Sequence, residues 1–238
     1  MTSPSFPERS TTMLESTVPL GESDPGGILE NIDVVVIDTE TFAPFVEDAI
    51  EQYSLGLASV KAAGSRLHRP NSFGLLGGTF EGDAMIVKQV AFATNVRAVE
   101  SVPLEEFKEN IVPQFGKQYD DGERGFWCDS RELLKIVREF ENAGLEMLGS
   151  VHMHPDWHRI GPAHERGTEN LSENPSRMDE YLFRNAGWPL NIICYLESRG
   201  GGITHTYAAW RPPALDDPSG RARKVTVRHF AHGHVGSE

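Results

Sequence analysis

Blocks of apolar and polar positions predict strands and helices from about residue 32 onward. Residues 32–37 are almost entirely apolar and predict a strand, and apolar side chains at helical spacing over 42–63 predict a helix that Gly64 ends. Later apolar runs of strand length, bounded by turn residues, predict strands at 74–77, 84–94, 145–151 and 204–210. Residues 95–119 show no clear pattern.

Composition divides the chain into three parts. Residues 1–30 are rich in Ser, Thr, Pro, Gly and Glu without a sustained period, which predicts a flexible leader. We expect a domain at 31–211 and a C-terminal extension at 212–238, because Pro212 and Pro213 begin a break in the pattern. Within that extension, residues 224–230 are either one more strand or a tail that pairs with a partner.

Two histidines follow the apolar run at 145–151. His152 and His154 stand at positions i and i+2, so on a strand both imidazoles point to the same face and can reach one metal ion. An isolated H-x-H pair also occurs by chance, so a metal site requires a third ligand.

Ser176 and Asp179 supply that candidate third ligand. Ser176 is suited to the N-cap of a helix over 177–186, which places Asp179 in the first turn, and Gly187 is suited to end the helix. Two imidazoles and one carboxylate fill three positions of a tetrahedral Zn²⁺ and leave the fourth open, as in catalytic zinc sites. The same two residues would also serve if they only capped the helix.

The pattern H-x-H-P followed by P-S-x-x-D resembles the signature of the JAMM/MPN metallopeptidase family. Other segments are similar to the family's strands and helices, namely 74–78, 126–129, 130–140 and 191–196. The resemblance covers about residues 32–211. It implies an α/β fold, with a central mixed β-sheet flanked by helices and a zinc site at a strand end and a helix N-terminus. It further implies that His152, His154 and Asp179 hold the zinc ion and that Ser176 faces the oxyanion.

Spacing is the first departure from the family. From Pro155 to Pro175, 21 residues separate His154 from Ser176, which is a longer insertion than in the family's common form. Without an insertion the motif would fall on Pro162 and Glu165, so Glu165 is a fallback ligand. Loops of this length in compact domains are often functional, and we expect the loop over 156–174 either to cover the open metal position or to be a disordered insertion.

The second departure concerns the general base. Asn71 stands at the position of the glutamate that activates water in the family, and an amide cannot accept a proton at neutral pH. Glu81 is the nearest acidic residue along the chain, but Gly82 marks a turn that places it at the far end of the strand.

The resemblance implies a zinc-dependent hydrolase that cleaves an amide bond at the C-terminus of a ubiquitin-like or sulfur-carrier protein. Two other classes stay open: an impaired MPN-type binding or scaffold protein, and a metal-dependent enzyme acting on a small molecule. In the last class, Asn71 would bind the substrate. A homodimer is compatible with all three.

Charge and hydropathy narrow the partners. The formal net charge is −13, which argues against binding of nucleic acid because phosphate contacts require clustered Lys and Arg. The sequence has neither an apolar run of membrane-span length nor the pattern of a signal peptide, so we expect a cytoplasmic protein. Cys128 and Cys194 lie in apolar settings and are expected to be core thiols.

Overall fold

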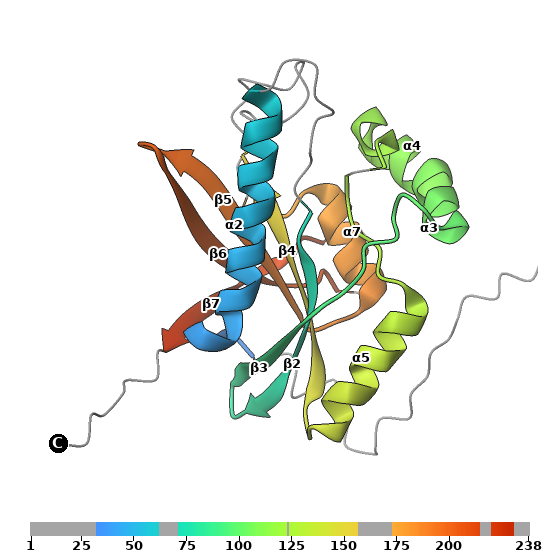
Figure 1. The fold of residues 1–238 in the computed structure, drawn as a ribbon. Helices are drawn as coiled ribbons and strands as arrows, with labels where there is room; N and C mark the ends of the chain where they lie inside the picture. Colours follow the sequence, from blue (N-terminus) through green and yellow to red (C-terminus); the bar gives the residue numbers. More distant parts are fainter. Residues whose placement is uncertain (1–31, 62–70, 123, 157–172, 215–219, 231–238) are drawn as a thin grey trace, which may run out of the picture. The chain divides into compact units, whose positions relative to one another are not determined.

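The computed structural model describes residues 32–61, 71–122, 124–156, 173–214 and 220–230 (Figure 1). The chain divides into two units, Met1–Asn31 and Ile32–Glu238, and every described residue lies in the second. The expected leader, Gly64, the fallback ligand Glu165 and most of the 156–174 loop lie outside the described residues.

Seven strands account for most of the described structure. The first half holds β1 (Val34–Asp38), β2 (Phe73–Glu81) and β3 (Ala84–Phe92), and the second half holds β4 (Glu146–Pro155), β5 (Leu190–Arg199), β6 (Gly202–Arg211) and β7 (Arg223–Phe230). The strands at 74–77, 84–94, 145–151 and 204–210 are confirmed to within a few residues. The segment 126–129, which resembled a strand, contributes only an isolated bridge between Asn95 and Cys128.

The helices lie between these strands. The long ones are α2 (Thr39–Lys61), α5 (Ser130–Asn142) and α7 (Arg177–Ala186). The segment without a clear sequence pattern forms four short helices, α3 (Ser101–Glu106), η1 (Phe107–Ile111), α4 (Val112–Phe115) and η2 (Lys117–Asp120). Among the described residues, no helix combines the length and the apolar character needed to cross a membrane.

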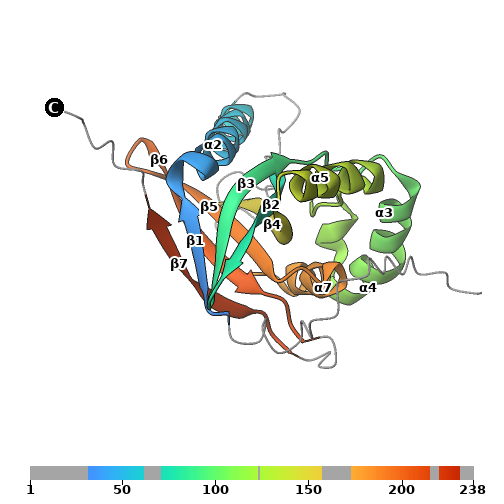
Figure 2. The ribbon, with the colours of Figure 1, turned by 90° about the horizontal axis from the view of Figure 1, so that it is seen from below.

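The strands close into a barrel in the order β1-β3-β2-β4-β5-β6-β7, so the expected helix-flanked central sheet is wrong. The reason is β7, which falls in the segment that the sequence left as either a strand or a partner-binding tail. It pairs antiparallel with β6 and parallel with β1, from Val34 opposite Thr226 onward. Figure 2 shows β7 running alongside β1. Closure gives both outer strands a partner and leaves neither as a free edge.

Helix α2 buries one face, formed by Phe42, Phe45, Ala49 and Tyr53, and contacts β1, β3 and β5. Helix α5 covers another part of the barrel, where Ile136 and Phe140 pack with Phe73 and Leu75 of β2. Strand β4 lies between β2 and β5, antiparallel to the first and parallel to the second. The histidine-bearing strand is therefore held by pairing on both of its edges.

Candidate metal centre

Strand β4 presents the two histidines on one face. Most of its residues from Leu148 to Met153 are buried, as expected for an apolar strand with a neighbour on each side. His152 is 5% exposed and His154 is half-buried. Because both side chains lie on the same face, their Nε2 atoms approach to 3.0 Å.

Helix α7 delivers the carboxylate through the N-cap geometry that the sequence predicted. The Ser176 hydroxyl accepts a hydrogen bond from the Asp179 backbone N–H at 3.1 Å, and the Ser176 N–H donates to Asp179 Oδ2 at 2.7 Å. This reciprocal capping box fixes the rotamer of Asp179, which is 3% exposed. Gly187 ends the helix with a left-handed backbone, as predicted.

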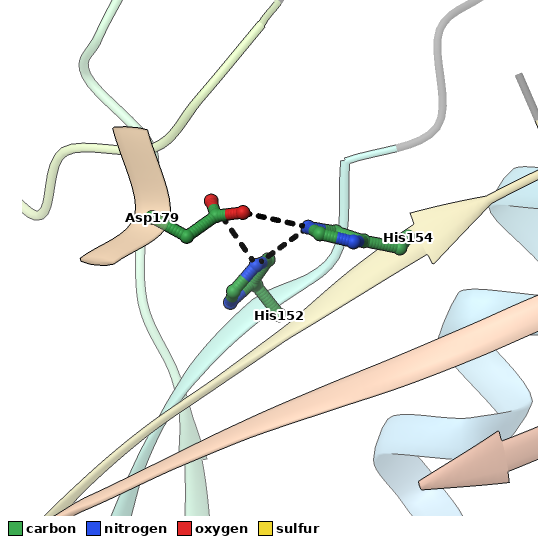
Figure 3. A group of neighbouring side chains, drawn as sticks. All are labelled: His152, His154 and Asp179. Carbon is green, nitrogen blue, oxygen red and sulfur yellow. Dashed lines mark hydrogen bonds and ion pairs between the residues drawn. The ribbon is translucent and has the colours of Figure 1, made fainter. Parts of the chain in front are cut away.

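The three predicted ligands converge (Figure 3), and their ligand atoms all lie within 4.8 Å of one another. His152 Nε2 is 3.7 Å from Asp179 Oδ1, and His154 Nε2 is 3.5 Å from Asp179 Oδ2. Donor atoms about 2.0–2.1 Å from a tetrahedral ion lie about 3.3 Å from one another. The separations of 3.0, 3.5 and 3.7 Å bracket that value, so the donor set fits a small divalent cation.

Burial keeps His152 in the neutral form that binds metals. Desolvation is the largest cause and the nearby His154 adds to it, and together they lower the pKa of His152 to about 3, although Asp179 opposes the shift. Aromatic rings supply the apolar surroundings: the Phe126 ring lies 4.7 Å from the imidazole and the Phe183 ring 6.1 Å. A neutral imidazole has a free lone pair for a cation without first losing a proton.

The supporting contacts of the two ligand types differ. A ligating histidine ordinarily donates its second ring N–H to an acceptor, and His152 Nδ1 is buried without a hydrogen-bond partner among the described residues. Asp179, in contrast, is held by the Ser176 backbone. The carboxylate is therefore fixed by hydrogen bonding, whereas the His152 ring is fixed mainly by packing.

Asn71 lies on the site face. Strand β2 pairs Phe73 with His152, and Met153 N donates to the Ser72 carbonyl at 3.1 Å, so the register continued by two residues sets Asn71 opposite His154. The Asn71 side chain is exposed. The residue at the position of the family's base is thus beside the ligands, and it is an amide.

Glu81 stands at the opposite end of β2 from Phe73. Eight residues of strand separate the two, which is roughly 26 Å. Its carboxylate accepts from the Thr79 hydroxyl and lies 3.9 Å from Lys88 Nζ. Its distance from the ligands removes Glu81 as a substitute base.

Sequence reasoning missed Tyr119 and the residues that hold it. Burial is the main reason that the pKa of Tyr119 is raised; its hydroxyl forms a hydrogen bond with the Ser176 side chain and is close enough to Asp179 and Arg124 to feel their charges. The Tyr119 carbonyl accepts from Arg97 Nη2 at 2.9 Å. No motif could have pointed to this tyrosine, because it comes from the segment without a clear pattern.

A buried carboxylate also follows the histidine motif. Asp156 is fully buried, accepts a hydrogen bond from the Tyr53 hydroxyl of α2, and accepts another from Ser198 N of β5 at 3.4 Å. Its own N–H donates to the Leu196 carbonyl at 3.1 Å. These bonds tie the end of β4, just beyond His154, to the rest of the barrel.

The molecule is thus a seven-stranded closed barrel with a candidate His-His-Asp metal centre. No family model matches the sequence, and no curated protein matches it. Among solved structures, the chain is similar to protein DSY2949 from Desulfitobacterium hafniense, with 16% identity, a TM-score of 0.43, and coverage of 83% of this chain and 93% of that one. A likeness this weak carries no argument about fold or function.

Proposed function

We propose that this protein is a zinc-dependent hydrolase with a site of JAMM/MPN type, cleaving an amide bond at the C-terminal tail of a ubiquitin-like or sulfur-carrier protein. The observation that carries the proposal is the convergence of His152, His154 and Asp179 within 4.8 Å. Neutral imidazole and carboxylate are ligands that suit Zn²⁺, and three of them leave the fourth tetrahedral position open.

Bound zinc would lower the pKa of its water to near 7 and polarise the scissile carbonyl. The protein's own groups would then orient the substrate. Ser176 lies at the α7 N-terminus, where backbone N–H groups and the helix dipole favour negative charge. Its hydroxyl would donate to the oxygen of the scissile carbonyl as negative charge develops there.

A second candidate, a binding or scaffold protein that retains its metal, is favoured by one observation. Asn71 faces His154 where the family has its base, and an amide can orient water but cannot take its proton. General-base assistance is worth about 10² to 10⁴ in rate, so the site would be slow without it. We favour the hydrolase because all three ligands are present and are fixed in one place.

Metal content is the first test. We expect about one zinc ion per chain in protein loaded with zinc and freed of excess metal, and its loss in the His154→Ala variant, measured by elemental analysis. His205→Ala is the matched control, because this histidine lies on β6 and is exposed. Equal zinc in the wild type and His154→Ala, or none in the wild type, refutes the metal site.

Hydrolysis is the second test. Zinc-loaded protein is incubated with ubiquitin-like proteins fused at their C-termini to a reporter, and the released reporter is measured. We expect cleavage at the end of the ubiquitin-like tail that stops when zinc is removed. Zinc retention with binding of the fusion and no cleavage would establish the scaffold alternative.

A further inference from the structure

Tyr119 is held against the first turn of α7 by contacts that leave it little freedom. Arg97 is 3% exposed, lies 3.6 Å above the Phe107 ring, and donates to the Tyr119 carbonyl. The Tyr119 ring packs against a cluster that includes Met178 and Leu182 of α7. Met178 lies between Ser176 and Asp179 in sequence, so the ring and the candidate centre share one helical turn.

The Tyr119 hydroxyl reaches the Ser176 side chain. A phenol with the ordinary tyrosine pKa near 10 is protonated at neutral pH, and burial raises the pKa of Tyr119 further. The group is therefore an O–H that can donate. The Asp179 carboxylate lies within electrostatic range of it, so a negative phenolate at this position would be repelled.

The hydrogen-bond capacity of Ser176 determines what this contact does. A serine hydroxyl has one proton to donate and two lone pairs that accept. One lone pair of Ser176 Oγ accepts the Asp179 backbone N–H. If Tyr119 donates to the second, both lone pairs are filled and the only remaining capacity of Ser176 is its own proton. That proton must then point away from both donors.

We propose that Tyr119 is a positioning residue that orients the Ser176 hydroxyl so that its proton is presented to an oxyanion at the candidate centre. This inference rests on the proposed function, and it adds a residue that lies outside the H-x-H-P and P-S-x-x-D motifs. Tyr119 acts only through Ser176. Removing its hydroxyl therefore costs oxyanion binding while Ser176 is present and costs nothing further when Ser176 is absent.

Inorganic phosphate serves as the oxyanion probe. Its dissociation constant is measured by calorimetry on zinc-loaded protein for the wild type, Tyr119→Phe, Ser176→Gly and the double variant, with zinc content determined for each. Ser176→Gly is chosen because glycine at an N-cap costs only a few tenths of a kcal/mol in stability. Tyr181→Phe is the control: that hydroxyl belongs to the same packed region but donates to Glu106 at 2.5 Å.

We expect Tyr119→Phe to weaken phosphate binding by about 3- to 10-fold, the range of one hydrogen bond. In the Ser176→Gly background the same change should alter binding by less than about 1.5-fold, and Tyr181→Phe should leave binding as in the wild type. With a cleavable fusion, Tyr119→Phe should lower kcat and leave KM unchanged.

Independent losses that multiply in the double variant would overturn the inference, as would unchanged phosphate binding in Tyr119→Phe. Loss of zinc from Tyr119→Phe would also overturn it, because the hydroxyl would then support the ligands instead of Ser176. Zinc-loaded wild type that binds no phosphate removes the oxyanion site and, with it, the inference. Wild type without zinc refutes the proposed function itself, so the two failures are distinguishable.

Discussion

Acid should destabilise the metal-free protein through His152 in particular. The ordinary histidine pKa is 6.5, and burial among aromatic rings lowers the pKa of His152 to about 3 in the folded protein. Between these two values the unfolded chain binds a proton at His152 and the folded chain does not. The free energy of unfolding therefore rises with pH in this window and falls as pH drops from 6.5 towards 3.

The size of this effect follows from the two pKa values. Each unit between the folded and unfolded pKa contributes about 1.4 kcal/mol. Going from pH 7.5 to pH 5 covers about 1.5 units below the unfolded pKa, so His152 alone should remove about 2 kcal/mol. For a domain of 150–250 residues this corresponds to a fall in Tm of about 4–8 °C.

The assay is urea unfolding of chelator-treated protein at pH 7.5 and pH 5, for the wild type and His152→Gln. Other groups titrate in both proteins, so the informative quantity is the difference between their pH-dependent losses, not either stability alone. We expect the wild type to lose about 2 kcal/mol more than the variant. Equal losses would mean that His152 is protonated in the folded state and that its burial does not control its charge.

Two further substitutions test other parts of the argument. Asn71→Glu should raise hydrolysis by the zinc-loaded protein at least about 10-fold, because a carboxylate opposite His154 can take a proton from water, and an unchanged rate in a variant that still binds zinc would favour the scaffold. Gly149→Ala should cost at least about 3 kcal/mol in urea unfolding, because its Cβ would lie 1.6 Å from the Leu190 carbonyl oxygen. At Gly144 a Cβ meets nothing within 4 Å, so Gly144→Ala should cost only the strain of its positive φ, about 1 kcal/mol; equal losses at the two glycines would refute the close contact.

Local sequence patterns were sufficient for most elements of this fold but not for its closure. Apolar runs identified the strand-length segments because alternation and burial leave a short-range signal. The pairing of β7 with β1 leaves none: Arg223 of β7 forms an ion pair with Asp33, 190 residues earlier in the chain. The expected flat, helix-flanked sheet and the observed barrel share nearly all of their strands, and β7 makes the difference.

The same contrast holds at the candidate centre. His152 and His154 are found by the two-residue period of a strand, and Ser176 with Asp179 by the spacing of a capping box. Tyr119 could not be found in this way, because it reaches the site through tertiary contacts of short helices that have no strong local pattern. Ligands on regular elements are thus accessible to sequence reasoning, whereas residues that orient them are not.

What chemistry is left to the site depends on which described carboxylates are already engaged. Asp156 accepts from a tyrosine of α2 and from a β5 backbone N–H, so it supports the end of β4. Glu180 follows Asp179 directly, but it is bonded to Arg177, to Arg221 and to a backbone N–H ahead of β7. Among the described residues, Asp179 is the only carboxylate in the ligand group. A ligand cannot also serve as the base, so the described part of the site has the parts to bind zinc and an oxyanion but no carboxylate to activate water.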